Sequence, residues 1–242
     1  MKLAVCQVPD IHGDVERSLA LIQSEALAAD GQGADIVGFP ECFLQGYDLD
    51  PNHIRRAAIE IESAAFNAIL GALEPRRATV VFGMIESARG RYYNAAVAVQ
   101  RGQVIAHYRK RHLLKAEEAF FDSGTTTPVF EVGSIRISLG ICHDLTITES
   151  AQVAARAGAT VLLCPCNNRL PRATAEAWKH RHTEIRTRRA REHGLWIATS
   201  DVAGGRNDEV SYGPTAVIDP TGRVVAQVPL LCAGHVIAEI HP

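Results

Sequence analysis

Three short segments of the chain each end in a side chain that could take part in catalysis. They are Phe39-Pro40-Glu41, Tyr108-Arg109-Lys110 and Gly140-Ile141-Cys142, and each follows an apolar run typical of a strand. A carboxylate, an ammonium and a thiol are the groups that open an unactivated carbon–nitrogen bond by thiol attack. In such chemistry the thiol is the nucleophile, the carboxylate moves protons and the ammonium faces the developing oxyanion.

Each of these side chains also has an ordinary structural explanation. A cysteine after an apolar strand is usually a buried small hydrophobe, a carboxylate there is more often solvated, and Lys110 lies in a run of basic residues. For Cys142 the context favours catalysis, because Gly140 permits a tight strand exit and a helix signal begins at Thr148-Glu149. A thiol near a helix N-terminus meets backbone N–H groups that favour thiolate and bind an oxyanion.

The surroundings of these residues resemble the nitrilase superfamily of carbon–nitrogen hydrolases, from residue 2 to about residue 240. Residues 40–47 (PECFLQGY) are similar to the family's proline–glutamate segment, and residues 108–113 (YRKRHL) are similar to its tyrosine–arginine–lysine segment. After Cys142 come His143 and Asp144, which resemble the amidase and carbamoylase branches. Nitrile-hydrolysing members tend to have tryptophan and glutamate there.

The resemblance implies roles for these side chains. Cys142 is the expected nucleophile and Glu41 the general base, and Lys110 holds the oxyanion together with the backbone N–H of His143. The expected activity is hydrolysis of a linear, non-peptide amide of a small molecule through a cysteine thioester, with release of ammonia or an amine. Hydrolysis of an N-carbamoyl amide or a nitrile is the alternative within this family.

A second carboxylate that orients Lys110 is expected several residues before a glycine. Glu117 stands in that position relative to Gly124 and is preferred, while its neighbour Glu118 is the alternative. The remaining expected site residues are substrate-binding ones, namely Tyr47, His143, Asn167 and Arg169.

One departure from the family pattern concerns substrate recognition. Many relatives carry arginine–phenylalanine–proline–glutamate shortly after the aspartate, but here residues 145–149 read LTITE. An arginine at that position could pair with a substrate carboxylate. Arg169 and Arg172 are candidates to replace it, although arginines in exposed loops are common.

The sequence gives weaker indications of three other classes of function. Cys164 and Cys166, with His180 and His182, suggest a zinc site, but their spacing fits no common structural motif. A papain-like pair of Cys142 with His143 or His193 would leave the Glu41 and Lys110 segments unexplained. A catalytically silent small-molecule binding protein on the same fold is the third alternative. We therefore expect no metal and no cofactor.

The amino-acid composition and net charge limit which binding partners we expect. The 242 residues are 47% hydrophobic and carry a formal net charge of −2, with a pI near 6.5. This balance gives no electrostatic reason to expect nucleic acid or an anionic membrane as partner. The first residues read as a strand rather than a signal peptide, and the six cysteines are scattered, so we expect reduced thiols and a cytoplasmic protein.

The apolar patterns predict alternating strands and helices in one domain, residues 1–242. Residues 33–40 and 158–165 echo one another, since each is a helix exit, a buried strand and a proline. Such halves suit either two packed sheets or one doubly wound sheet. The family resemblance implies the α/β four-layer α-β-β-α sandwich. It also implies a homodimer or higher homo-oligomer, paired through helices near the nucleophile. The expected helices include 14–31, 51–73, 149–157 and 174–193.

Overall fold

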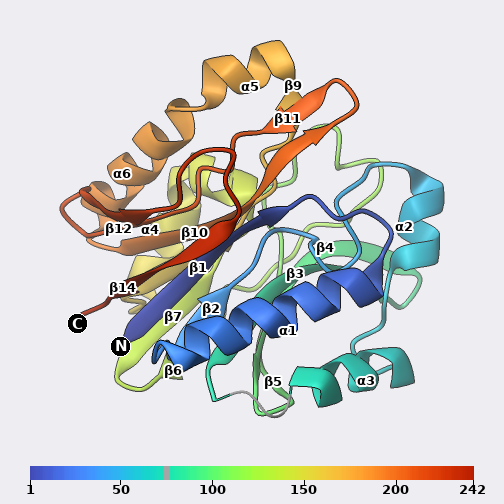
Figure 1. The fold of residues 1–242 in the computed structure, drawn as a ribbon, viewed down its shortest axis with the longest axis horizontal. Helices are drawn as coiled ribbons and strands as arrows, with labels where there is room; N and C mark the ends of the chain where they lie inside the picture. The colour runs from blue at the N-terminus through green and yellow to red at the C-terminus, as the bar shows by residue number, and fades with distance from the viewer. Residues whose placement is uncertain (74–76) are drawn as a thin grey trace.

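The computed structural model describes residues 1–73 and 77–242, and it contains two β-sheets packed face to face (Figure 1). The first sheet has the strand order β5-β4-β3-β2-β1-β14, in which β1, β2 and β3 are parallel. Its strands are β1 (Lys2–Pro9), β2 (Ile36–Gly38), β3 (Thr79–Ala88), β4 (Arg91–Gln100), β5 (Gln103–Arg109) and β14 (Gly234–Glu239).

The second sheet has the order β6-β7-β8-β10-β12-β13, in which β7, β8 and β10 are parallel. Its strands are β6 (Val129–Val132), β7 (Ile135–Leu139), β8 (Val161–Pro165), β10 (Trp196–Arg206), β12 (Ala216–Ile218) and β13 (Val224–Gln227). The two sheets join where the end of β1 pairs with β10, at Gln7 opposite Asp201. The far end of β10 carries a small ribbon of β11 (Glu209–Ser211) and β9 (Leu170–Pro171).

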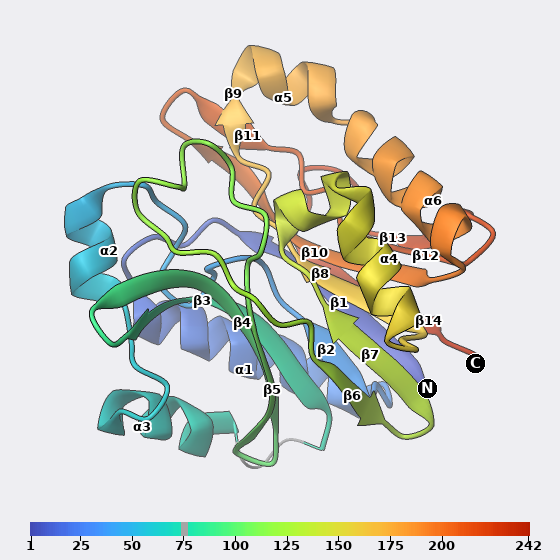
Figure 2. The same cartoon turned by 180° about the vertical axis from the view of Figure 1, so that it is seen from behind.

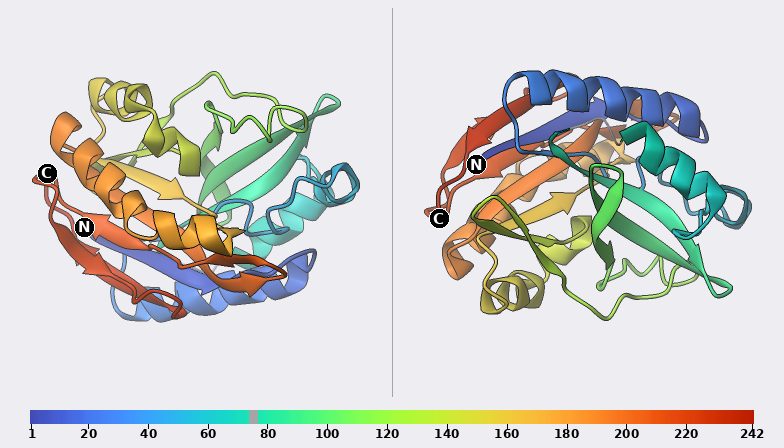
Figure 3. Two further views of the ribbon diagram at one scale, coloured as in Figure 1. Left: turned by 90° about the horizontal axis from the view of Figure 1, so that it is seen from above. Right: turned by 90° about the horizontal axis from the view of Figure 1, so that it is seen from below.

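Helices cover the outer face of each sheet (Figure 3). On the first sheet these are α1 (Val15–Gly31), which Asp14 caps by accepting a hydrogen bond from the N–H of Arg17, and α3 (Ala64–Leu73). On the second sheet they are α4 (Thr148–Arg156) and α6 (Arg181–His193). The remaining helices are α2 (Pro51–Ala57), α5 (Arg172–Trp178) and the 3₁₀ helix η1 (Cys142–Thr146).

Central strands have apolar side chains on both faces because each lies between a helix layer and the other sheet. In β3, Phe82 packs in the core shared with α1 and α3, whereas Val81 packs in the core between the sheets. In β8, Leu162 faces α4 and α6, and Leu163 faces the other sheet. The layers are therefore helix, sheet, sheet and helix, and the predicted four-layer sandwich is confirmed.

The two echoing segments form β2 and β8, one in each sheet. Their proline ends meet, because the N–H of Glu41 donates to the carbonyl of Cys166 at 3.2 Å. The parallel strands that precede the reactive residues thus end on the same side of the sandwich.

Some expected elements were wrong in detail. Residues 51–73 form two helices, α2 and α3, rather than one. The helix expected over 174–193 is also two, because the chain changes direction between Trp178 and Arg181, where the Trp178 ring packs against Arg181 and His182. The pairing of β9 with β11 was missed, since two residues carry no periodic signal. Among the helices of the described residues, none is long and apolar enough to cross a membrane.

Candidate active site

Glu41 lies in the turn that follows β2, with 1% of its surface exposed. Its Oε1 accepts hydrogen bonds from Lys110 Nζ at 2.8 Å and from Asn94 Nδ2 at 2.7 Å, and its Oε2 accepts one from the N–H of Asn167 at 3.0 Å. The turn packs directly on Gly83 of β3, where a Cβ would lie 2.6 Å from the Cα of Glu41. Burial raises the pKa of Glu41, and the nearby Glu117 carboxylate raises it further, although Lys110 opposes both.

Lys110 comes directly after β5 and is also buried. Its ammonium donates to Glu41 Oε1 and to Glu117 Oε1, each at 2.8 Å. Burial alone would lower the pKa of Lys110, but the two carboxylates outweigh burial and raise it above its ordinary value. The preceding Arg109 is held by Glu86 through two hydrogen bonds, so Lys110 alone of the two enters the site. Lys110 is thus a permanent buried cation.

The second carboxylate lies in the long segment between β5 and β6, which runs between α2 and α4 (Figure 2). Glu117 is buried, and in addition to Lys110 it accepts hydrogen bonds from Tyr47 Oη at 3.2 Å and from the N–H of Leu114 at 2.7 Å. Glu118 has a side chain 50% exposed and pairs with Lys115 instead. The geometry therefore brings Glu117, and not Glu118, to the lysine.

Asn94 is a member of the site that the sequence analysis missed. It lies on β4, is fully buried, and its Nδ2 donates to both Glu41 Oε1 and Glu117 Oε1. In the sequence, Asn94 is a single amide in the mostly apolar run of β4. Such a residue could have been predicted to have polar partners, because a buried polar side chain needs them. We call Glu41, Asn94, Lys110 and Glu117 the acid–lysine cluster.

Cys142 begins η1 and has a φ of 41°, a left-handed conformation that is uncommon for a side chain other than glycine. The tight exit from β7 is therefore made at Cys142 itself rather than at Gly140. Its thiol donates to Asn168 Oδ1 at 3.7 Å. A hydrogen bond to the Cys166 thiol, burial and the Glu41 carboxylate all raise the pKa of the Cys142 thiol. The raised pKa favours the protonated thiol at Cys142.

Asp144 ties the cysteine segment to the lysine segment. Its Oδ2 accepts from Tyr108 Oη at 2.7 Å and from the N–H of Ile141 at 2.9 Å, and its Oδ1 accepts from the N–H of His112 at 3.0 Å. Since Tyr108 and His112 flank Lys110, the aspartate fixes the position of η1 relative to the ammonium.

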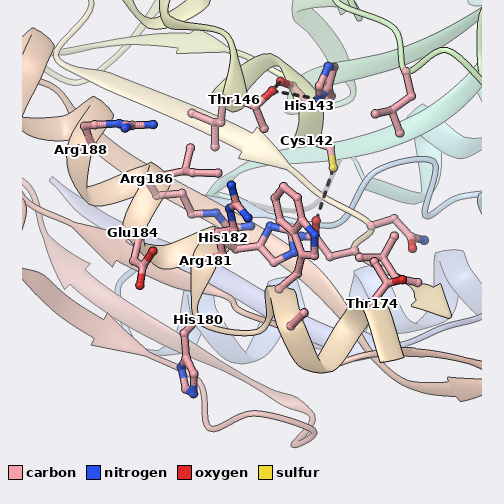
Figure 4. Close-up of a pocket in the computed structure, with 18 of the residues that line it drawn as sticks. Cys142, His143, Thr146, Thr174, His180, Arg181, His182, Glu184, Arg186 and Arg188 are labelled. Atoms are coloured by element: carbon pink, nitrogen blue, oxygen red, sulfur yellow. Dashed lines mark hydrogen bonds between the residues drawn. The ribbon is translucent and has the colours of Figure 1, made fainter. Parts of the chain in front are cut away.

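Cys142 opens onto a cleft of about 950 Å³ (Figure 4). His143 and Asn167 line this cleft, together with apolar side chains that include Leu114, Leu145 and Leu170. We call the α5 and α6 side chains that line it the cleft wall, namely Thr174, Ala177, Trp178, Arg181, His182, Glu184, Ile185, Arg186, Arg188 and Arg191. Burial and Arg186 lower the pKa of His182 to about 3, so His182 is neutral at physiological pH.

Two expected substrate-binding residues lie beside the cleft rather than among the residues that line it. Tyr47 points its hydroxyl at Glu117, as described above. Arg169 has a side chain 8% exposed, and its guanidinium contacts Asp10 Oδ2 at 2.6 Å and Glu209 Oε2 at 2.8 Å. Tyr47 therefore contacts the acid–lysine cluster, Arg169 is held by two carboxylates outside it, and Arg172 lies on α5 outside the lining residues.

The geometry gives little support to a metal site or to a catalytic cysteine–histidine pair. Within residues 1–73 and 77–242, no group of three or more histidine, cysteine, aspartate or glutamate side chains is placed to hold a metal ion. The His143 ring pairs through Nδ1 with Thr146 Oγ1 at 2.9 Å, and burial and Lys110 lower its pKa. In the described part of the chain, the Cys142 thiol bonds to Asn168 rather than to the His143 ring.

Comparison with known proteins places this geometry among carbon–nitrogen hydrolases. The chain is 27% identical over 226 residues to an (R)-stereoselective amidase of Pseudomonas sp, covering 93% of this chain and 80% of that protein. It is 30% identical over 243 residues to the omega-amidase of Homo sapiens, covering 94% and 83%. It is also 34% identical over 225 residues to the glutamine-dependent NAD(+) synthetase of Xylella fastidiosa. This match covers 87% of this chain but only 38% of the synthetase.

The fold has a solved counterpart in an amidase from Nesterenkonia sp. AN1. The two superpose with a TM-score of 0.88 over 100% of this chain and 93% of that one, at 24% sequence identity. The sequence model of the family described as carbon-nitrogen hydrolase matches residues 2–242. This match confirms the resemblance, and the chain therefore belongs to the carbon–nitrogen hydrolase family.

Proposed function

We propose that the protein hydrolyses the amide bond of a small molecule through a thioester on Cys142. The observation that carries this proposal is the acid–lysine cluster, whose Glu41 accepts a hydrogen bond from the N–H of Asn167, a residue that lines the cleft into which Cys142 opens. A buried ammonium shared by two carboxylates, next to a thiol, supplies a base, an oxyanion ligand and a nucleophile in one place.

In the first half of the reaction, Glu41 takes the thiol proton as the sulfur attacks the amide carbon. Lys110 has three N–H groups, of which two are used by Glu41 and Glu117, so the third is directed to the substrate oxygen. The backbone N–H of His143, in the first turn of η1, is the second donor to that oxygen. The tetrahedral intermediate collapses when Glu41 passes its proton to the nitrogen, which leaves as ammonia or an amine.

In the second half, Glu41 takes a proton from water, and the resulting hydroxide attacks the thioester carbonyl. The same two donors hold the second oxyanion, and collapse returns the proton to the Cys142 sulfur and releases the acid. The pKa directions support this sequence. The thiol pKa is raised, so attack needs a base, and the Glu41 pKa is raised toward that of its proton partners.

The relatives support amide substrates. Two of those compared above are amidases, and the Nesterenkonia amidase has been solved with acrylamide added to its active-site cysteine. Its family membership and these relatives identify the protein as an amide-cleaving hydrolase.

The experiment is an ammonia-release screen against linear amides, N-carbamoyl amino acids and nitriles, run on the wild type and on Cys142→Ala. We expect amide turnover by the wild type, none by Cys142→Ala, and an acyl mass on Cys142 in rapidly quenched samples. Cys232→Ala is the matched control, because Cys232 is exposed, and it should behave as the wild type. Turnover by Cys142→Ala, or an acyl group on another residue, would contradict the mechanism. Selective cleavage of nitriles would instead assign the protein to the nitrile-hydrolysing members of the family.

We further propose that residues 1–242 act as one domain and that the protein forms a homodimer through α4 and α6. Both helices contact η1, and both carry exposed residues. Light scattering at micromolar concentration tests the dimer, and a monomeric mass would contradict it.

A further inference from the structure

Asn94 makes three contacts to the other residues of the acid–lysine cluster. Its side chain donates to Glu41 and Glu117, and its main-chain carbonyl accepts the N–H of Lys110 at 2.8 Å. We propose that Asn94 is a positioning residue, whose amide holds the two carboxylates at the spacing that lets one ammonium serve both. This inference rests on the hydrolase mechanism proposed above.

Four atoms form a closed ring of alternating donors and acceptors. Lys110 Nζ bonds to both carboxylate oxygens at 2.8 Å, and Asn94 Nδ2 bonds to the same two oxygens at 2.7 and 3.1 Å. Two carboxylates in a buried site repel one another, and one ammonium neutralises only one of them. The amide adds two further hydrogen bonds to the same oxygens without adding charge, which keeps both acids in place.

The orientation of the amide is fixed by its other end. Asn94 Oδ1 accepts a hydrogen bond from Cys42 Sγ at 3.3 Å, so Nδ2 is the atom that faces the carboxylates. With the reverse orientation a carbonyl oxygen would face two carboxylate oxygens, and all three would be acceptors. The site therefore needs an NH₂ group at this position, and an isosteric acid would lack it.

The amide also bears on the protonation of Glu41. Its hydrogen bond lowers the pKa of Glu41, against burial and Glu117, which raise it. The titratable groups that face Glu41 are Lys110 from the end of β5, Glu117 from the following segment, Cys142 from η1, and Cys42 and Tyr47 from its own loop. Because the base must be ionised to take the thiol proton, activity is lost as pH falls through the Glu41 pKa. Without the amide this loss begins at higher pH.

The test uses Asn94→Asp and Asn94→Ala in the full chain. We expect kcat/KM to fall about a hundredfold in both, the size of effect that follows when catalytic groups shift by about an ångström. The acidic limb of the kcat/KM profile should move to higher pH. The rate of alkylation by iodoacetamide gives a second pH profile that needs no substrate, with the modified cysteine identified by peptide mapping. Its midpoint for Cys142 should move in the same direction.

Tyr93→Phe is the matched control, since Tyr93 is the neighbour on β4 that packs under Arg109 rather than in the cluster. It should keep the wild-type activity and both pH profiles. Both Asn94 variants with kcat/KM within threefold of the wild type would overturn the inference. So would a lower melting temperature with unmoved pH profiles, which is the result of a purely structural role. If Asn94→Asp does not fold, Asn94→Ala carries the same test. Activity in Cys142→Ala would instead overturn the underlying mechanism, so the two failures are distinguishable.

Discussion

The acid–lysine cluster and the exposed arginines of the cleft wall are built in opposite ways. In the cluster, Glu41 and Lys110 are each 1% exposed and Glu117 is 0% exposed, and the Lys110 ammonium donates to each of the two carboxylates at 2.8 Å. In the cleft wall, Arg181 and Arg188 are exposed. Arg181 stacks over the Trp178 ring at 4.9 Å, and Arg188 is 4.0 Å from Glu192.

The difference follows from the cost of burying charge. An ionised group inside the protein needs partners in good geometry, so each residue of the cluster constrains the others. An exposed arginine is solvated by water and needs no such partner. On the proposed mechanism we therefore expect the cluster to determine the chemistry, and the exposed arginines of the wall to affect which substrate binds. Changes in the first should alter kcat, and changes in the second should alter KM.

The largest effect is expected for Lys110. Both Lys110→Ala and Lys110→Arg should lower kcat/KM by about a thousandfold, because the site is shaped for a compact ammonium and an oxyanion donor is lost or displaced. Steady-state kinetics on one confirmed amide measures this, alongside circular dichroism to verify folding. Lys115→Arg is the control, since Lys115 is exposed and pairs only with Glu118 in the described part of the chain. Wild-type activity in Lys110→Arg would remove Lys110 from the mechanism.

A smaller loss is expected for the second carboxylate. Glu117→Ala should lower kcat/KM about a hundredfold and Glu117→Gln about tenfold, because the amide still accepts a hydrogen bond but no longer stabilises the ammonium. Glu118→Gln should be nearly neutral, since its side chain is half exposed and contacts Lys115. The same kinetic assay compares all three. A damaging Glu118→Gln with a mild Glu117→Ala would move the supporting role to Glu118.

The predictable part of the site is the part that lies in short continuous segments. Glu41, Lys110 and Cys142 each follow a strand, and local sequence identifies both the strand and the residue after it. Asn94 was missed because a single amide within a strand has no local signature, and its partners are 53 and 23 residues away. The same limit applies to Arg169, whose partner Asp10 is 159 residues away. Local sequence patterns do not predict contacts between side chains that lie far apart in the chain.

Arg169 is expected to affect stability more than catalysis. Arg169→Met should lower the free energy of unfolding by about 3 kcal/mol, because it leaves the buried Asp10 carboxylate without its closest cation. The kcat/KM should change less than tenfold, since the guanidinium is engaged by Asp10 and Glu209 rather than by the acid–lysine cluster. Urea denaturation and amide kinetics measure the two quantities. A large rise in KM with unchanged stability would restore Arg169 to substrate binding.

The smallest effect is expected at the cleft wall. Arg181, Arg188 and Arg191 outnumber Glu184 among the charged side chains on α5 and α6 that face the cleft from exposed positions. An amide that carries a distal carboxylate should therefore bind more tightly than its neutral analogue, through attraction that water and salt screen. The double variant Arg181→Gln with Arg188→Gln should raise KM for the anionic amide about threefold to tenfold and leave kcat unchanged for both amides.

That preference is measured as the ratio of KM values for matched anionic and neutral amides at low and at high salt. The KM of the neutral amide divided by the KM of the anionic amide should approach one in the double variant, and in the wild type this quotient should fall toward one as salt is added. Lys115→Gln removes one positive charge outside the cleft, half the change of the double variant, and should leave the ratio unchanged, which separates a local effect from one of net charge. A loss of kcat in the double variant would mean that the wall and the acid–lysine cluster are coupled, contrary to the division of roles that their burial implies.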